Sequence, residues 1–311
     1  MRNAFADELT KIAAEDLRVI LLSGDIGNKL FDKFKDQSDV RFYNCGVAEA
    51  NMIGVAAGMA LSGLRPFVYT ITPFTTTRCF EQIRVDACYH RVPVVIVGTG
   101  SGLSYAELGP THHSLEDMAI LRTLPNMRVL APCDSTELRL ALRAVLQDDN
   151  PAYIRIGKKG EPEIYKEPPT FKIGEAIIVR PGNDIVLLST GTMMSEAIKA
   201  ADHLAAHGIS AEITSFHTVK PLDFVYLAQA GKRFRLVVTV EEHSRIGGFG
   251  SAVAEWYLAQ KQSVPLMGFA TEDTFMHEVG TQEYARRKFG LTADNMATNI
   301  LRRLSLDAQK A

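Results

Sequence analysis

Short apolar runs alternate with segments of helical periodicity along the first half of the chain. The apolar runs have the length of single strands and lack polar alternation, as expected of strands buried on both faces. Between them, apolar residues recur every three or four positions, which is typical of amphipathic helices. The predicted strands cover residues 19–22, 41–45, 67–71, 93–97, 128–131 and 152–156, and the predicted helices cover residues 1–16, 52–61, 76–90, 114–121 and 135–147. This alternation predicts a parallel sheet covered by helices on both faces.

The second half repeats the pattern after a segment that shows neither period. Residues 157–174 are rich in Lys, Glu and Pro, a composition typical of a connection between domains. Beyond it we predict strands at 184–189, 210–215 and 236–239 and helices at 194–207, 223–230, 251–260 and 281–308. We therefore predict an α/β protein with two α/β domains in series. The first covers residues 1–160, a linker covers 161–174, and a smaller domain covers 175–311.

Composition and charge exclude several classes of protein. The 311 residues suffice for two domains, and 46% hydrophobic with 23% charged residues is typical of soluble globular proteins. The net charge of −2 is spread without blocks of one sign, so nothing indicates binding to nucleic acid or to an anionic membrane. The N-terminal helix carries acidic residues unlike a signal peptide, and no apolar run is long enough to cross a membrane. Four cysteines without CxxC spacing favour a cytoplasmic protein.

Glu49 is the most conspicuous polar residue of the first domain. It stands in the segment RFYNCGVAEANMIGVAAGMALSG, between a predicted strand and a helix dense in Ala and Gly. An acid at the mouth of such a helix is expected to be poorly solvated, and desolvation raises the pKa of a carboxyl group toward neutrality. A carboxyl group of that kind can exchange a proton. The alternative is an ordinary first-turn acid stabilised by the helix dipole, and the spacing alone does not decide between the two.

Two turns carry further candidates. Phe74 lies in a Thr-rich turn between a strand and a helix, where an exposed aromatic ring can support a flat heterocycle; the alternative is packing into the core. His112 lies in the sequence GPTHHSLED and is a candidate for hydrogen bonding or proton transfer; the alternative is a surface-loop histidine. Metal binding by this loop is not expected, because no third ligand follows at useful spacing.

A Gly-rich turn, in the sequence EEHSRIGGFGSAVAEW, opens a helix in the second half. Helix N-termini bind anions, so a phosphate-binding loop is one interpretation. The pattern GGFG matches neither GxGxxG nor a Walker loop. We therefore favour close packing of the helix on its strand.

Seven motifs, taken in order, resemble those of the transketolase family. They are GVAEANM, TPFTTTRCFEQIR, GPTHHSLED, LPNMRVLAPCD, PAYIRIGK, VKPLD and VEEHSRIGGFGSAVAE. The chain is most similar to the C-terminal subunit of a split, two-subunit transketolase, from about residue 5 to about residue 305. The resemblance implies a pyrimidine-binding domain for thiamine diphosphate, followed by a transketolase C-terminal domain. The implied reaction transfers a two-carbon ketol unit from a ketose donor to an aldose acceptor.

The resemblance also implies roles for the candidate residues. Glu49 corresponds to the glutamate that hydrogen-bonds a ring nitrogen of the aminopyrimidine, and so favours the tautomer that takes the proton from the thiazolium carbon. Phe74 corresponds to the aromatic residue that stacks on that ring. His112 corresponds to the GPTH histidine that contacts the donor hydroxyls. Lys158 falls where many members use Arg to hold a sugar phosphate, so it keeps the charge without the two-pronged geometry.

Several positions depart from the family pattern. Asp25, Ile71 and Thr77 are expected near the cofactor, although Ile71 and Thr77 replace aromatic residues of the full-length enzymes. Leu108 replaces the Asp of DGPTH, and the loop after strand 93–97 begins Gly100-Ser101 in place of His-Asp or His-Ala. Loss of a hydroxyl-binding carboxylate favours a less polar, deoxy or otherwise modified sugar over the usual phosphorylated pair.

One motif of the family is missing from the sequence. Mg²⁺ and the diphosphate are held in this family by GDG and a downstream Asn, whereas this chain has Gly24-Asp25-Ile26-Gly27. The resemblance therefore implies an N-terminal, diphosphate-binding partner subunit, an α2β2 heterotetramer, and no activity of this chain alone. Two alternatives stay open. One is the beta subunit of a 2-oxo acid dehydrogenase, which the GPTHHSLED loop disfavours; the other is a non-catalytic α/β subunit. A deoxyxylulose-phosphate synthase-like activity is close, but those enzymes are single chains.

Overall fold

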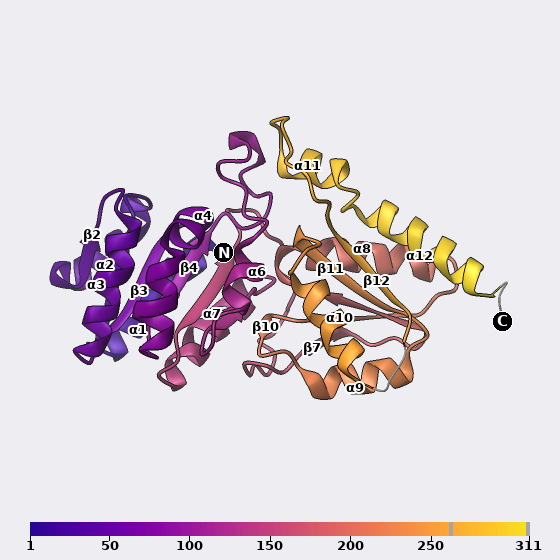
Figure 1. Cartoon of the computed structure of the whole chain (residues 1–311), viewed down its shortest axis with the longest axis horizontal. Coiled ribbons are helices and arrows are strands. Elements are labelled where there is room, and N and C mark those ends of the chain that lie inside the picture. Colours follow the sequence, from indigo (N-terminus) through magenta and orange to yellow (C-terminus); the bar gives the residue numbers. More distant parts are fainter. Residues whose placement is uncertain (261–263, 309–311) are drawn as a thin grey trace.

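The computed structural model describes residues 1–260 and 264–308, which form two α/β domains side by side (Figure 1). The first half of the chain builds one sheet and most of the second half builds the other. Residues 157–176, which connect them, contain no helix or strand. No helix in the described part of the chain is long and apolar enough to span a membrane.

The first sheet has seven strands in the order β10-β5-β6-β4-β3-β1-β2. Its strands are β1 (Val19–Ser23), β2 (Phe42–Asn44), β3 (Arg65–Ile71), β4 (Val95–Thr99), β5 (Arg128–Leu130), β6 (Ala152–Ile156) and β10 (Thr218–Lys220). All neighbours are parallel except β10, which pairs antiparallel with β5. Strand β10 comes from the second half of the chain, so the second domain adds one edge strand to the first sheet.

Helices cover both faces of this sheet. They are α1 (Arg2–Glu15), α2 (Asp32–Gln37), α3 (Glu49–Leu61), α4 (Thr72–Thr75), α5 (Phe80–Gln82), α6 (Asp117–Arg122) and α7 (Ser135–Ala144). Successive residues of β3 alternate between the two apolar cores, since Phe67 and Tyr69 pack with α1 and α7 whereas Val68 packs with α3. A strand buried on both faces explains why β3 reads as a continuous apolar run.

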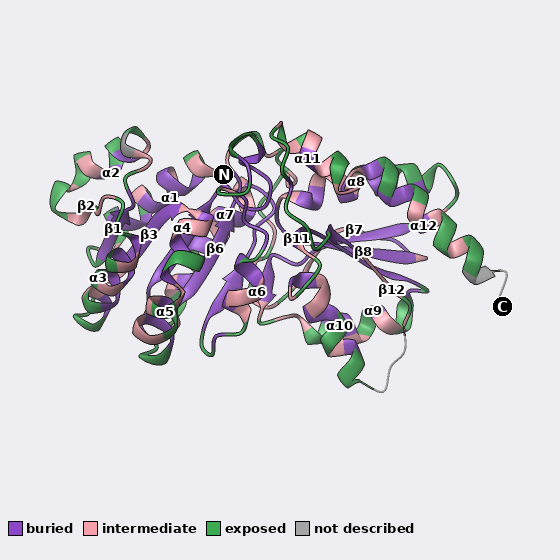
Figure 2. Ribbon diagram, turned by 45° about the horizontal axis from the view of Figure 1, so that its top comes forward, coloured by how far each residue is buried: buried purple, intermediate pink, exposed green. Residues whose placement is uncertain are grey.

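The second sheet has five strands in the order β12-β11-β8-β9-β7, with only β7 antiparallel. Its strands are β7 (Ile177–Arg180), β8 (Ile185–Ser189), β9 (Ala211–Ser215), β11 (Val237–Ser244) and β12 (Leu266–Thr271). Its helices are α8 (Met194–Ala205), α9 (Phe224–Arg233), α10 (Phe249–Ala259), α11 (Gln282–Lys288) and α12 (Ala293–Ala308). Figure 2 shows both sheets as buried layers between half-exposed helices.

Two predicted helices are not continuous. The predicted helix 281–308 is divided into α11 and α12, with residues 289–292 between them. Residues 76–90 do not form a continuous helix: α4 ends at Thr75, a 3₁₀ turn covers Thr77–Cys79, α5 follows, and Ile83–Tyr89 is π-helical. The Thr-rich sequence accounts for the break, because the hydroxyl groups of Thr76 and Thr77 donate to the carbonyls of Thr72 and Pro73. Such bonds compete with regular helix. The break turns this segment at the sheet edge where the candidate residues lie.

Candidate functional site

The candidate residues lie along one edge of the first sheet. Phe74 follows β3 directly and His112 lies in the loop after β4. Lys158 follows β6, and Glu49 begins α3 shortly after β2. These strands run parallel within the order β6-β4-β3-β1-β2, so their carboxyl ends meet at a single edge. In open α/β sheets, ligands bind at that edge.

Glu49 is buried, with 3% of its surface exposed. Its Oε2 accepts a hydrogen bond of 2.8 Å from Nη1 of Arg78. The carboxylate also stands in the first turn of α3, where the helix dipole favours negative charge. The burial that the proton-exchange argument requires is therefore present, and so is the first-turn position of its alternative. The ion pair with Arg78 is a feature that the sequence did not predict.

Phe74 is half-buried and presents a ring face to the same guanidinium group. The Cζ atom of Arg78 lies 4.3 Å from the centre of the Phe74 ring, within the range of a cation–π contact. The hydroxyl of Thr72 donates to the carbonyl of Thr99 at 3.0 Å and ties the turn to β4. Phe74 is thus held at the edge of the sheet rather than inside its core.

His112 joins this cluster from the next strand. Its ring lies 5.3 Å from Phe74 and 6.0 Å from Tyr105, edge-to-face with both. Its Nδ1 lies 2.9 Å from the hydroxyl of Thr111. The neighbouring His113 is buried instead, and desolvation lowers the pKa of His113. The two adjacent histidines therefore differ: His112 contacts the rings of the cluster and His113 is buried.

Lys158 joins the cluster through Tyr105. Its ammonium group lies 4.6 Å from the centre of the Tyr105 ring and pairs with the carboxylate of Glu107. This ion pair lowers the pKa of Glu107. We call the connected side chains the edge row; they are Glu49, Arg78, Phe74, His112, Tyr105, Lys158 and Glu107. Four of its seven members were predicted from the sequence.

The remaining cofactor candidates stand apart from the edge row. Asp25 is exposed, and its carboxylate accepts from the side-chain amide of Asn44 at 3.0 Å. The Thr77 hydroxyl bonds to a backbone carbonyl of its own turn, and Ile71 is half-buried at the end of β3. Within the described residues, no ring or polar contact links these three to the edge row. Their predicted proximity to a cofactor stays a prediction.

Gly100 has a structural reason that explains its departure from the family pattern. Its φ of +76° disfavours any residue with a side chain, and a Cβ there would lie 1.9 Å from the ring of Tyr105. Glycine is therefore what allows Tyr105 to reach the edge row. A histidine at this position is incompatible with the observed Tyr105.

Residues of both domains contact the loop that carries His112. Glu242, at the end of β11, accepts from the backbone of Leu103 at 2.7 Å and from Gln282 at 2.8 Å, and pairs with Arg286. Buried Arg155 donates to the carbonyls of Ser114 and Glu242 at 2.8 and 2.9 Å. The loop that carries His112 is therefore in contact with both domains.

The tip of this loop lies against a segment of the second domain, and both project from the body of the protein (Figure 1). Gly280 donates to the carbonyl of Ala106, and Gly109 faces Val279. Leu108 and Val279 are exposed by 48% and 63%. Leu108 is therefore at the surface of the chain, next to a second exposed apolar residue.

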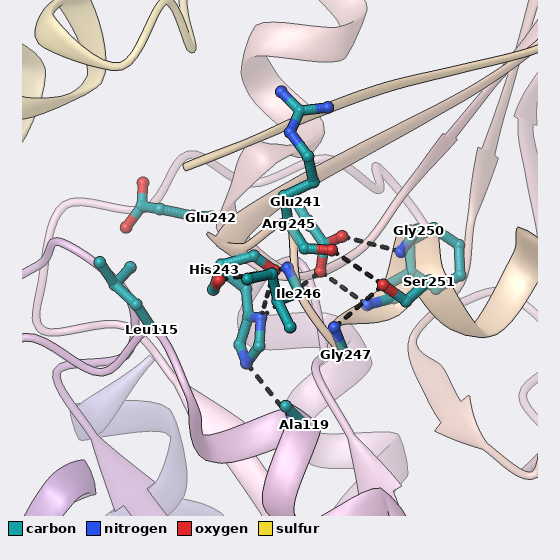
Figure 3. Close-up of polar contacts among 12 residues, drawn as sticks. Leu115, Ala119, Glu241, Glu242, His243, Arg245, Ile246, Gly247, Gly250 and Ser251 are labelled. Atoms are coloured by element: carbon teal, nitrogen blue, oxygen red, sulfur yellow. Dashed lines mark hydrogen bonds and ion pairs between the residues drawn. The ribbon is translucent and has the colours of Figure 1, made fainter. Parts of the chain in front are cut away.

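The Gly-rich turn is explained by packing rather than by anion binding. The carboxylate of Glu241 accepts from the backbone nitrogen atoms of Phe249 and Gly250, at 2.6 and 2.7 Å; Figure 3 shows the contact with Gly250. The amides that would bind a phosphate group are thus already satisfied. Burial raises the pKa of Glu241 to about 7 and lowers that of the adjacent His243 to about 4.

A metal site of the chain's own finds no support in the geometry. Among residues 1–260 and 264–308, no group of three or more His, Cys, Asp or Glu side chains lies close enough to hold a metal ion.

Both halves of the chain match known family models. The transketolase pyrimidine-binding domain matches residues 1–161 and the transketolase C-terminal domain matches residues 174–296. The matches agree with the two α/β domains in series and with the resemblance indicated by the seven motifs.

Two curated relatives and one solved structure are similar over nearly the whole chain. The 6-deoxy-6-sulfo-D-fructose transketolase subunit of a Clostridium species is 40% identical over 294 residues, covering 94% of this chain and 91% of the relative. An apulose-4-phosphate transketolase subunit of Phocaeicola vulgatus is 32% identical over 274 residues, covering 88% of each. A split-gene transketolase, solved as an inactive beta4 tetramer, has a TM-score of 0.88 at 33% identity and 98% coverage of both chains.

The buried pair Glu241 and His243 predicts a pH dependence of stability. Because the pKa of Glu241 is raised in the folded state, folded Glu241 binds more protons than unfolded Glu241 between about pH 4.5 and 7, and its contribution to stability falls as pH rises. Because the pKa of His243 is lowered, folded His243 binds fewer protons between about pH 4 and 6.5, and its contribution to stability rises with pH. The two slopes oppose each other in the wild-type protein. In Glu241→Gln the Glu241 slope is lost and the His243 slope remains, so the stability of this variant relative to wild type should rise with pH by at most about 1.4 kcal/mol per unit.

Urea unfolding at pH 5 and 6.5 measures this difference. Exposed Glu163 offers the matched control, since Glu163→Gln should leave the pH dependence unchanged. Equal pH dependence in Glu241→Gln and the wild-type protein would contradict the assignment.

Proposed function

The chain belongs to the transketolase family, and we propose that it is the C-terminal subunit of a two-subunit, thiamine diphosphate-dependent transketolase. The observation that carries this proposal is the pairing of a buried carboxylate with an aromatic face at the sheet edge. Because the relatives that are similar over nearly their whole length are named as transketolase subunits, we prefer this function to that of a 2-oxo acid dehydrogenase subunit.

The pair formed by Glu49 and Phe74 fits an aminopyrimidine ring. It already holds a planar, nitrogen-bearing group of this kind, because the guanidinium of Arg78 lies 2.8 Å from the Glu49 carboxylate and 4.3 Å from the Phe74 ring. An aminopyrimidine is likewise planar and has a ring nitrogen that can carry a proton. Bound thiamine diphosphate supplies the nucleophilic carbon and the electron sink for cleaving the bond beside a ketose carbonyl.

Four members of the edge row have a task in this reaction. Glu49, screened from water, exchanges a proton with the ring nitrogen. Phe74 fixes the plane of the ring by stacking. His112, held against Phe74 and Tyr105, donates hydrogen bonds to the donor hydroxyls. Lys158 binds an anionic end of the sugar as a point charge rather than as a fork.

We propose that an N-terminal subunit with GDG and a downstream Asn supplies the Mg²⁺ and diphosphate sites. One observation supports a partner at this edge: exposed apolar side chains lie in α3 and in the segment just before it. They are Val40, Tyr43, Val47 and Val55. Exposed apolar patches mark contact surfaces. We propose an α2β2 heterotetramer in the cytoplasm, inactive when either subunit is absent.

The substrate is proposed to be a modified sugar, deoxy or otherwise less polar near Leu108. Replacing a hydroxyl-binding carboxylate by an apolar side chain removes the reason to prefer a hydroxyl there. The relative that is 40% identical acts, by its name, on a 6-deoxy-6-sulfo sugar. Lys158 suits an anionic terminus of such a molecule, whether phosphate or sulfonate.

The first test of this function is Glu49→Gln. The amide keeps the shape of the side chain but cannot exchange the proton, so ketol transfer by the assembled two-subunit enzyme should fall by about 10²-fold or more. Glu81, exposed and paired with Arg84, gives the control Glu81→Gln, which should retain activity. Turnover of Glu49→Gln at the wild-type rate would refute the role of Glu49.

The second test separates donor binding from cofactor binding. His112→Ala should lower kcat/KM for the ketose donor by about 10²-fold while the affinity for thiamine diphosphate stays within about twofold of wild type. His207, exposed and bonded only to its own helix within the described residues, gives the control His207→Ala. Unchanged donor kinetics in His112→Ala would remove this residue from the site.

A further inference from the structure

Arg78 contacts both groups that the proposed function assigns to the aminopyrimidine ring. Its Nη1 is 2.8 Å from the Glu49 Oε2 atom, and its Cζ is 4.3 Å from the centre of the Phe74 ring. The guanidinium is planar, donates N–H bonds and stacks on aromatic faces. A protonated aminopyrimidine shares these three properties. The two groups compete for one carboxylate oxygen and one ring face.

We infer that Arg78 is a placeholder, which occupies the pyrimidine position in the cofactor-free chain and leaves it when the cofactor binds. This inference rests on the proposed function, since it assumes that the pyrimidine binds between Glu49 and Phe74. It adds a positioning residue that holds the site ready and is displaced before the reaction begins.

The burial of Glu49 explains why a placeholder is useful. The side chain of Glu49 is 2% exposed, and a buried carboxylate without a partner is strongly unfavourable. Arg78 supplies the positive charge that keeps the carboxylate in place while the pyrimidine is absent. The stacked guanidinium also covers the face of Phe74, which would otherwise be open to solvent.

The surroundings of Arg78 allow its side chain to leave without disturbing the fold. Its side chain is 46% exposed, and within the described residues its guanidinium hydrogen-bonds only to Glu49. The backbone on either side is fixed, because the Thr76 hydroxyl donates to the carbonyl of Thr72 and Cys79 Sγ lies 3.1 Å from the carbonyl of Phe74. Rotation of the side chain alone therefore clears the position.

Competition between Arg78 and the cofactor predicts two opposite effects of removing the side chain. In the assembled, cofactor-free enzyme, Arg78→Ala should bind thiamine diphosphate more tightly, by about tenfold, because a charge-assisted hydrogen bond no longer has to be broken. The same variant should unfold at a lower temperature without cofactor, because Glu49 has lost its counter-ion, and should recover that loss on saturation with cofactor.

Isothermal titration with thiamine diphosphate and Mg²⁺ measures the affinity, and thermal unfolding with and without cofactor measures the stability. Arg78→Lys keeps the charge without the flat face and should give an intermediate affinity. Arg84 lies six residues after Arg78, is exposed and pairs with Glu81. It gives the control Arg84→Ala, whose affinity for thiamine diphosphate should equal that of wild type.

Three results would overturn the placeholder. Weaker cofactor binding by both Arg78 variants would make Arg78 a ligand of the cofactor, and unchanged binding would make it a bystander. Should Arg78→Ala fail to fold, Arg78→Lys decides between these. Absence of saturable binding in the wild-type assembly and in Arg84→Ala would refute the proposed function itself and the placeholder with it, an outcome distinct from the other two.

Discussion

The central constraint on this structure is a carboxylate buried at a sheet edge. Glu49 is withdrawn from water at the start of α3, and a charge in that position needs a partner. Arg78 provides one and at the same time stacks on Phe74. The edge row therefore begins with an electrostatic requirement, and the aromatic and basic side chains that follow are arranged around it.

The rest of the fold serves to hold that row in place. Parallel strands bring the ends of β3, β4 and β6 to one edge. The long loop after β4 is held by Glu242 of the second domain and by Arg155 of β6. A buried charged side chain is costly to leave without its hydrogen-bond partners. The second domain contributes no member of the edge row, but its Glu242 contacts the loop that carries His112.

Much of the site could be predicted from the sequence, because parallel strands place successive strand ends together. Glu49, Phe74, His112 and Lys158 each follow a predicted strand, and the structure brings them into one row. Arg78 was missed because residues 76–90 were predicted as one continuous helix. In the structure this segment is broken near Arg78, whose side chain contacts Glu49. Tyr105 was missed because its position depends on Gly100, whose positive φ leaves no periodic signal. The strands β7, β10 and β12 were also missed: β7 is a partly exposed edge strand, β10 is three residues long, and β12 is interrupted by Gly268.

The central claim is that this chain binds the pyrimidine half of thiamine diphosphate and leaves the diphosphate to a partner. A crystal structure of the two subunits assembled with thiamine diphosphate and Mg²⁺ tests it most directly. The account predicts an aminopyrimidine ring stacked on Phe74, with a ring nitrogen hydrogen-bonded to Glu49. It also predicts that all protein ligands of the Mg²⁺ ion come from the partner subunit. A ring bound away from Glu49, or a diphosphate held by this chain, would contradict it.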